Sequence, residues 1–106
     1  MKTALVIIAQ RGYQDQELDG TLKGLKSHGF SATLASVKAG SCIGKFGGTR
    51  DATIALADVA IADFERVAFI GGPGAHALAE NPDAHRIAKD TLAAGKVLGA
   101  ICIAPL

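Results

Sequence analysis

Aromatic residues, cysteines and long apolar runs are all scarce in this chain of 106 residues. It has four phenylalanines, one tyrosine and no tryptophan, although 49% of its residues are hydrophobic. A core made mainly of Ala, Val, Ile and Leu is typical of a parallel sheet covered by helices and suits a β-sandwich less well. The length allows one domain with a single core.

Other absences narrow the classes of function. Two cysteines, Cys42 and Cys102, provide no disulfide framework and cannot supply the four ligands of a structural zinc site. No apolar stretch approaches the ~20 residues of a membrane span, and Met1-Lys2 leads into a predicted strand rather than a signal peptide. The 11 basic and 10 acidic residues form no run of one sign, which argues against nucleic acid or an anionic membrane as a partner. We therefore expect a soluble, reduced, cytoplasmic protein.

Two nucleotide-binding patterns are incomplete. In the glycine-rich segment 72–77, a proline occupies the tight turn meant for a pyrophosphate, and no acidic residue closes a following strand. The Gly44-Lys45 pair resembles the end of a Walker A loop, but Phe46 replaces the Ser or Thr that binds magnesium. We therefore expect neither a cofactor nor a metal.

Short apolar runs alternate along the chain with amphipathic segments. The runs predict parallel strands, and the segments between them predict helices with apolar residues one turn apart. The expected strands are 3–9, 31–37, 66–70 and 96–101, and the expected helices are 15–28 and 82–94. Residues 38–48 are expected as a loop or irregular hairpin, and 49–56 as a short edge strand. This order predicts an α/β open sheet with right-handed crossovers.

Cys102 lies where the last predicted strand meets a predicted helix. Ala100 and Ala104 flank it two residues away on either side, and Pro105 suits the first turn of a helix. This is the pattern of a nucleophile elbow, which exposes its nucleophile at the top of the sheet and in the field of a helix N-terminus. The alternative is a buried cysteine packed as a small hydrophobe, and this stretch alone does not decide between them.

Other candidate residues follow strands at the same edge of the predicted sheet, where α/β proteins bind ligands. Backbone N–H groups at Gly71 and Gly72, with that of Ile103, can form an oxyanion hole, or the glycines simply make a tight turn. Glu17, in the first turn of a helix, can hydrogen-bond a thiolate above it, or it is a solvated carboxylate. His76 is the histidine predicted nearest the site, although a surface position is more common for such a residue.

Three segments together resemble the ThiJ/PfpI superfamily: YQDQEL at 13–18, IGGP at 70–73 and AICIAP at 100–105. That superfamily includes protease- and amidase-like proteins, glyoxalase- and deglycase-like enzymes and the parkinsonism-associated protein. The resemblance implies a flavodoxin-like three-layer sandwich with a parallel central sheet, related to class I glutamine amidotransferases. It implies Cys102 as the nucleophile, Glu17 bonded to it, and an oxyanion N–H from Gly72. It also implies assembly as dimers or higher oligomers.

The chain departs from the superfamily pattern in two ways. Many protease-like members have a histidine directly after the cysteine, where this chain has Ile103. The superfamily's domain also continues beyond the position of Leu106, so residues 1–106 are expected to be the N-terminal portion of one such domain. We expect a cysteine-dependent enzyme that acts on small reactive carbonyls, or on amides of small molecules or peptides. The alternative is a non-enzymatic redox-sensing or chaperone-like stress protein.

Overall fold

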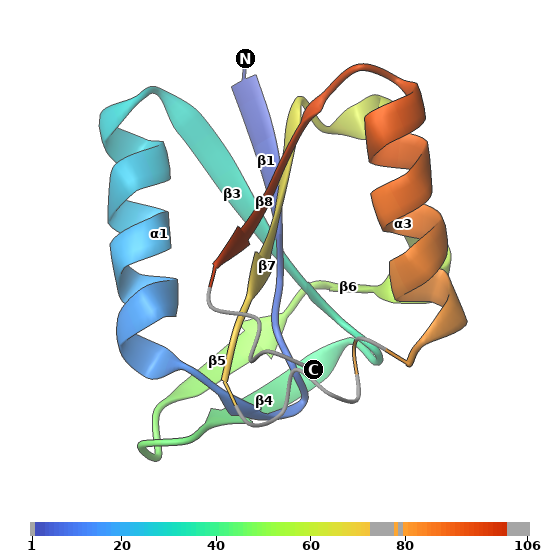
Figure 1. Cartoon of the computed structure of the whole chain (residues 1–106). Coiled ribbons are helices and arrows are strands. Elements are labelled where there is room, and N and C mark those ends of the chain that lie inside the picture. The colour runs from blue at the N-terminus through green and yellow to red at the C-terminus, as the bar shows by residue number, and fades with distance from the viewer. Residues whose placement is uncertain (1, 73–77, 79, 102–106) are drawn as a thin grey trace.

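A five-stranded parallel sheet forms the centre of the molecule (Figure 1). The computed structural model describes residues 2–72, 78 and 80–101. The strands of this sheet are β1 (Lys2–Ile7), β3 (Phe30–Ser36), β6 (Ile54–Ala55), β7 (Arg66–Ile70) and β8 (Val97–Ile101). Their order is β6-β3-β1-β7-β8, and all neighbouring pairs are parallel. The four strands expected from the sequence are confirmed, with no end shifted by more than two residues.

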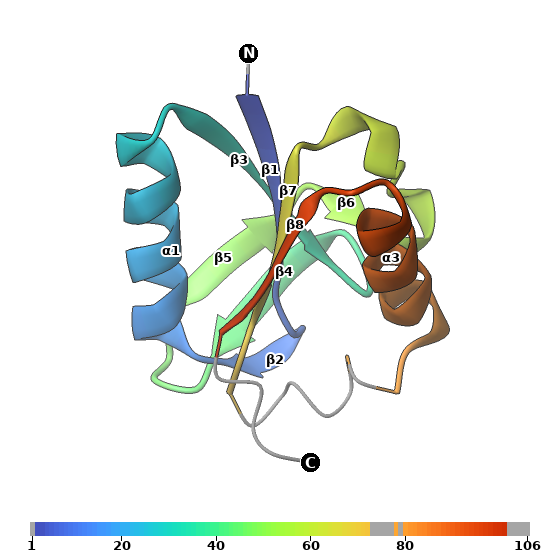
Figure 2. The same cartoon turned by 45° about the horizontal axis from the view of Figure 1, so that its top comes forward.

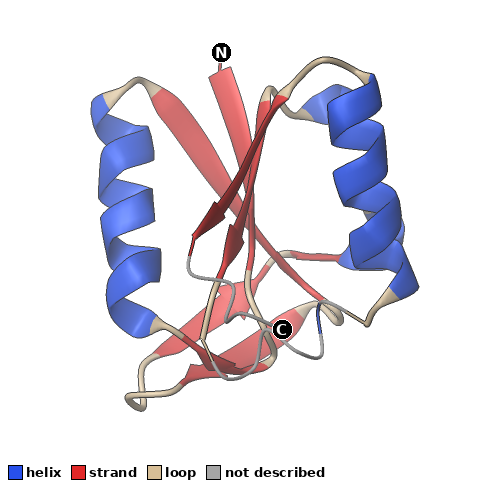
Figure 3. Cartoon of the chain, in the orientation of Figure 1, coloured by secondary structure: helices blue, strands red, loops and turns tan. Residues whose placement is uncertain are grey.

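Helices cover the two faces of this sheet and give three layers (Figure 3). Helix α1 (Asp15–Ser27) lies on one side of the sheet and α3 (Pro82–Ala93) on the other. The flavodoxin-like sandwich expected for this chain is therefore confirmed. Neither helix is long and apolar enough to cross a membrane, and the same holds for every helix in the part of the chain that the structure describes.

Strand β1 is the buried centre of the sheet. Leu5, Val6 and Ile7 are fully buried, and the strand pairs with β3 on one edge and β7 on the other. Because a helix layer covers each face, the side chains from Ala4 onward are apolar, which explains the continuous run in the sequence, whereas Thr3 is only partly buried and Lys2 is exposed. The strand ends at Ile7, but Ile8 stays fully buried and its N–H still donates to the Ala35 carbonyl at 2.9 Å.

Local signals explain where the two helices begin and end. The Gln14 side-chain oxygen accepts the N–H groups of the first turn of α1, and Gly29, at φ +81°, follows its end. The Asn81 side chain caps α3 by accepting the N–H of Asp83 at 2.9 Å and that of Ala84 at 3.1 Å. The sequence-based boundaries of both helices are correct to within one residue.

The segment from 38 to 56 differs from expectation in part. Strands β4 (Gly40–Gly44) and β5 (Thr49–Ala52) form an antiparallel hairpin, and β4 also pairs with the short strand β2 (Arg11–Tyr13). These three strands make a second, smaller sheet (Figure 2). The single edge strand expected over 49–56 is wrong, because the chain changes sheets at Thr53, whose N–H donates to the Leu34 carbonyl at 2.9 Å. Only β6 belongs to the main sheet.

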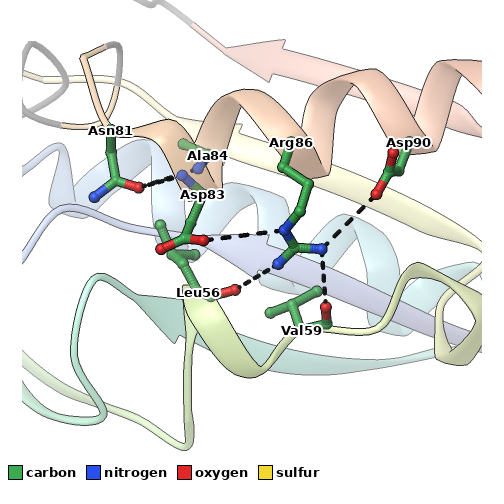
Figure 4. Close-up of polar contacts among 7 residues, drawn as sticks. All are labelled: Leu56, Val59, Asn81, Asp83, Ala84, Arg86 and Asp90. Carbon is green, nitrogen blue, oxygen red and sulfur yellow. Dashed lines mark hydrogen bonds and ion pairs between the residues drawn. The ribbon is translucent and has the colours of Figure 1, made fainter.

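Two short 3-10 helices, η1 (Leu56–Asp58) and η2 (Ile61–Asp63), connect β6 to β7, and a side chain of α3 hydrogen-bonds the first of them. The Arg86 guanidinium donates to the Leu56 carbonyl at 3.0 Å and to the Val59 carbonyl at 3.2 Å (Figure 4). Asp83 and Asp90 flank the same guanidinium at 4.0 and 3.8 Å. These contacts add a second donor to the Leu56 carbonyl, which already accepts the Val59 N–H at 3.2 Å, and they supply a donor to the Val59 carbonyl at the end of the turn.

A second cation fastens the end of this connection from the main sheet. The Lys96 Nζ, immediately before β8, donates to the carbonyls of Ile61 and Phe64, each at 2.6 Å. The connection between β6 and β7 is therefore held to both α3 and β8 by long basic side chains.

Candidate functional site

The carboxyl ends of β7 and β8 reach the same edge of the sheet. Ile70, the last residue of β7, pairs with Ile101, the last residue of β8, and the two strands are parallel. Gly71 and Gly72 follow β7 directly. Among the predicted site residues, Cys102, Ile103 and His76 lie outside the described residues, whereas Glu17, Gly71 and Gly72 are described.

The two glycines after β7 lie against the loop that precedes α1. The Gly71 carbonyl accepts the Gln14 N–H at 2.9 Å. Gly72 has φ +120°, and a Cβ added there would lie 2.5 Å from the Gly12 carbonyl oxygen and 2.8 Å from the Gln14 nitrogen. Both neighbours are backbone atoms, so this close approach requires glycine. The sequence indicated a tight turn, but it did not show what the turn lies against.

Glu17 has a carboxyl oxygen that lacks a hydrogen-bond partner among the described residues. It is partly buried in the first turn of α1, and its N–H donates to the Gln14 side chain at 3.4 Å. Its Oε2 is buried, and no described residue hydrogen-bonds it. Burying a carboxyl oxygen without a hydrogen bond lowers the stability of the folded protein, so a group of this kind is a candidate for a functional role.

Gln14 joins these two parts of the site. Its side chain caps the turn that carries Glu17, and its backbone N–H donates to Gly71. Sequence reasoning missed this role because glutamine is not a preferred N-cap residue, so nothing in the sequence marked the position.

Asp15 fastens the β4–β5 hairpin to the start of α1. Its carboxylate accepts the Phe46 N–H at 3.0 Å and the Gly48 N–H at 2.9 Å. The Phe46 hydrogen bond, with that of Gly48, lowers the pKa of the Asp15 carboxyl despite its partial desolvation. Gly44 and Gly48 touch this carboxylate so closely that neither position has room for a Cβ.

Tyr13 also holds the β4–β5 hairpin against the segment that precedes α1. Its side chain is fully buried, and its carbonyl accepts the Lys45 N–H at 2.9 Å. Burial, with the nearby negative charge of Asp15, raises the pKa of the Tyr13 phenol. A cleft of about 160 Å³ beside it is lined by Tyr13, Asp15, Asp19, Gly48, Thr49 and Arg50, rather than by Glu17 or the glycine pair.

The remaining thiol and histidines are placed as follows. Cys42, expected in a glycine-rich loop, lies in strand β4 and is fully buried, with the Gln10 Nε2 at 3.5 Å from its sulfur. The expectation of a loop position is wrong because the hairpin turns this segment into the core. His28, which follows the end of α1, and His85, in the first turn of α3, are exposed.

Comparison with known proteins identifies the group to which this chain is related. The sequence profile of the DJ-1/PfpI family matches residues 2–106. The chain belongs to this family. The superfamily resemblance of the three motifs is therefore confirmed.

Solved structures of the DJ-1/PfpI family share the fold. The ThiJ/PfpI domain protein from Brachyspira murdochii superposes with a TM-score of 0.88 at 26% identity, covering 92% of this chain and 57% of that one. DJ-1beta from Drosophila melanogaster superposes with a TM-score of 0.86 at 27% identity, covering 98% of this chain and 56% of that one.

Curated sequences add relatives named as enzymes. A deglycase of Pyrococcus abyssi is 30% identical over 101 residues, covering 95% of this chain and 61% of that protein. The chain spans between 53% and 61% of the length of the curated relatives it matches.

Proposed function

We propose that this DJ-1/PfpI family protein is a cysteine-dependent enzyme of deglycase or glyoxalase type, with Cys102 as its nucleophile and small reactive carbonyls as substrates. The observation that carries this proposal is the position of Glu17, partly buried in a turn that Gln14 ties to the Gly71–Gly72 pair, at the edge of the sheet where β7 and β8 end. Two relatives named as deglycases, at 30% and 29% identity, support the same class of substrate.

The proposed chemistry begins with attack of the Cys102 thiolate on the carbonyl carbon. A sulfur–carbon bond forms, and the electron pair of the C=O π bond moves to oxygen. The backbone N–H groups of Gly72 and Ile103 stabilise this oxyanion until the Glu17 carboxyl transfers its proton. The products of this step are a neutral hemithioacetal and the Glu17 carboxylate, so charge and protons balance.

Ile103 favours carbonyl chemistry over amide hydrolysis. Expulsion of an amine from a tetrahedral intermediate needs a general acid, which a histidine beside the nucleophile would supply. Position 103 holds isoleucine instead. Adding a thiolate to an aldehyde expels no leaving group, so a single carboxyl is sufficient.

The first test is the relative reactivity of the two thiols. Cys42 is fully buried and serves as an internal reference. Brief iodoacetamide treatment of the folded protein at mildly acidic pH, mapped by mass spectrometry, should label Cys102 first. Glu17→Leu should slow that labelling, and Glu17→Gln should slow it less because it keeps a hydrogen-bond donor. Labelling of Cys42 as fast as Cys102 would contradict the assignment.

The second test is turnover of an α-oxoaldehyde such as methylglyoxal. Cys102→Ser should abolish conversion to the hydroxy acid, whereas Cys42→Ala should retain it. If Cys102→Ser converts substrate at the rate of the unsubstituted protein, the enzyme proposal is wrong. Retained suppression of aggregation by an inactive Cys102→Ser protein would instead favour a chaperone-like function. Assembly into a homo-oligomer is likewise a proposal, which sedimentation can check.

A further inference from the structure

Two buried side-chain oxygens, Glu17 Oε2 and Thr21 Oγ1, lack a hydrogen-bond partner among the described residues. Both belong to α1, one helical turn apart. A buried polar group that is left unpaired destabilises the folded state. Because two such groups lie one turn apart in the same helix, a shared explanation for both is simpler than two independent ones.

Helix geometry brings these two oxygens to one face. Residues four apart have Cβ atoms about 5–6 Å from each other. Helical side chains lean toward the N-terminus, so the side chain of Thr21 overlies the turn that carries Glu17. Thr21 borders the buried face of the helix, because Leu18, three residues before it, is fully buried and Leu25, four residues after it, is partly buried.

Thr91 in α3 shows what a buried helical threonine does when it has no other role. Its hydroxyl donates to the Ile87 carbonyl at 2.6 Å, one turn back in its own helix. Threonine commonly satisfies its hydroxyl in this way. The corresponding acceptor for Thr21 is the Glu17 carbonyl, and within the described part of the chain the Thr21 hydroxyl makes no such bond. Its proton is therefore available to another acceptor.

We propose that Thr21 is the positioning residue for Glu17, and that its hydroxyl donates to Glu17 Oε2 after a small rotation of either side chain. This inference rests on the proposed function and extends it. A carboxyl oxygen that accepts a hydrogen bond is the one that stays unprotonated, so Thr21 fixes the acidic proton of Glu17 on the other oxygen. That arrangement orients a single donor toward the thiolate and the oxyanion, and it satisfies both buried oxygens with one bond.

The test compares Thr21→Val, which removes the hydroxyl at nearly constant volume, with Thr21→Ser, which keeps it. Thr91→Val is the matched control, since it removes a buried helical hydroxyl that is satisfied by its own helix. The chain has only three glutamates, at 17, 65 and 80, so the carboxyl carbons of 13C-labelled glutamate can be assigned with Glu17→Gln. Thr21→Val should move the Glu17 resonance, and Thr21→Ser should restore it. Thr91→Val should leave it in place.

Alkylation of Cys102 provides the second readout. Thr21→Val should slow labelling roughly 3- to 10-fold, the change expected for one lost hydrogen bond of about 1 kcal/mol, and should have no further effect in a Glu17→Leu background. An unmoved Glu17 resonance in Thr21→Val, or a slowing that persists unchanged in Glu17→Leu, would overturn the role of Thr21. These results leave the proposed function intact if Cys102 still reacts before Cys42. The opposite order of labelling in the unsubstituted protein would defeat both ideas.

Discussion

Replacing Gly72 with alanine should damage both the stability of the protein and its candidate site. At φ +120°, an L-residue is strained by about 1–3 kcal/mol. The new Cβ would also lie 2.5 Å from the Gly12 carbonyl oxygen and 2.8 Å from the Gln14 nitrogen. Relief requires the loop and the turn to separate, which breaks the 2.9 Å hydrogen bond from Gln14 to Gly71 at a cost of about 1 kcal/mol.

These contributions together predict a loss of about 2–4 kcal/mol in the free energy of unfolding. For a domain of this size, such a loss lowers the unfolding temperature by roughly 10–20 °C. Thermal unfolding followed by circular dichroism measures it directly. In the folded variant, Cys102 should also alkylate more slowly, because Gln14 no longer ties the turn of Glu17 to the glycine pair.

Gly20→Ala is the matched control for this prediction. Gly20 is an exposed residue inside α1, and a Cβ there meets nothing within 4 Å. Alanine should therefore raise stability by up to about 1 kcal/mol, because it suits a helix interior better than glycine. If Gly72→Ala melts within two or three degrees (about 0.5 kcal/mol) of the unsubstituted protein, the close approach described here does not constrain the turn.

Two further predictions concern the supports around the site. Because the pKa of Asp15 is lowered in the folded state, its contribution to stability is present above about pH 4 and is lost as the pH falls through the native pKa. In urea unfolding at pH 7, Asp15→Asn should therefore have a lower free energy of unfolding than the unsubstituted protein. The difference between the two proteins should shrink in acid. A difference that grows in acid would contradict the assignment. Arg86→Met should lower the free energy of unfolding by about 1–3 kcal/mol, because it removes two charge-assisted hydrogen bonds to backbone carbonyls. Lys89→Met, on the exposed side of α3, should change that free energy by less than about 0.5 kcal/mol. Equal effects of the two substitutions in chemical denaturation would refute the role of Arg86.

The elements that the sequence predicts well are those whose signals are local. Strand β1 is recognisable because both of its faces are buried, which leaves an unbroken apolar run. Helix α3 is recognisable because Asn81 and Pro82 mark its start. The motifs at 70–73 and 13–18 correctly indicated that Gly72 and Glu17 belong to elements that meet at one edge of the sheet.

The parts that escaped prediction depend on partners distant in the sequence. Strand β2 contains only three residues and exists because β4 pairs with it. Cys42 is buried because the hairpin folds against Gln10, and no local pattern around the cysteine shows this. The link from Gln14 to the glycine turn is also invisible locally, because the Gly71 carbonyl that accepts its N–H belongs to a distant segment.

The central position of β1 has a consequence for how the chain is made. One neighbour, β3, follows after a single helix, but the other, β7, is synthesised only after the hairpin and both 3-10 helices. Closing that longer loop costs more entropy, so β1 and β3 pair first, and β7 joins later. During this interval β1 exposes an unpaired, entirely apolar edge on the nascent chain, which invites association with other chains. The arrival of residues 66–70 therefore pairs this edge of β1 and moves the unpaired edge of the sheet to β7, until β8 is made.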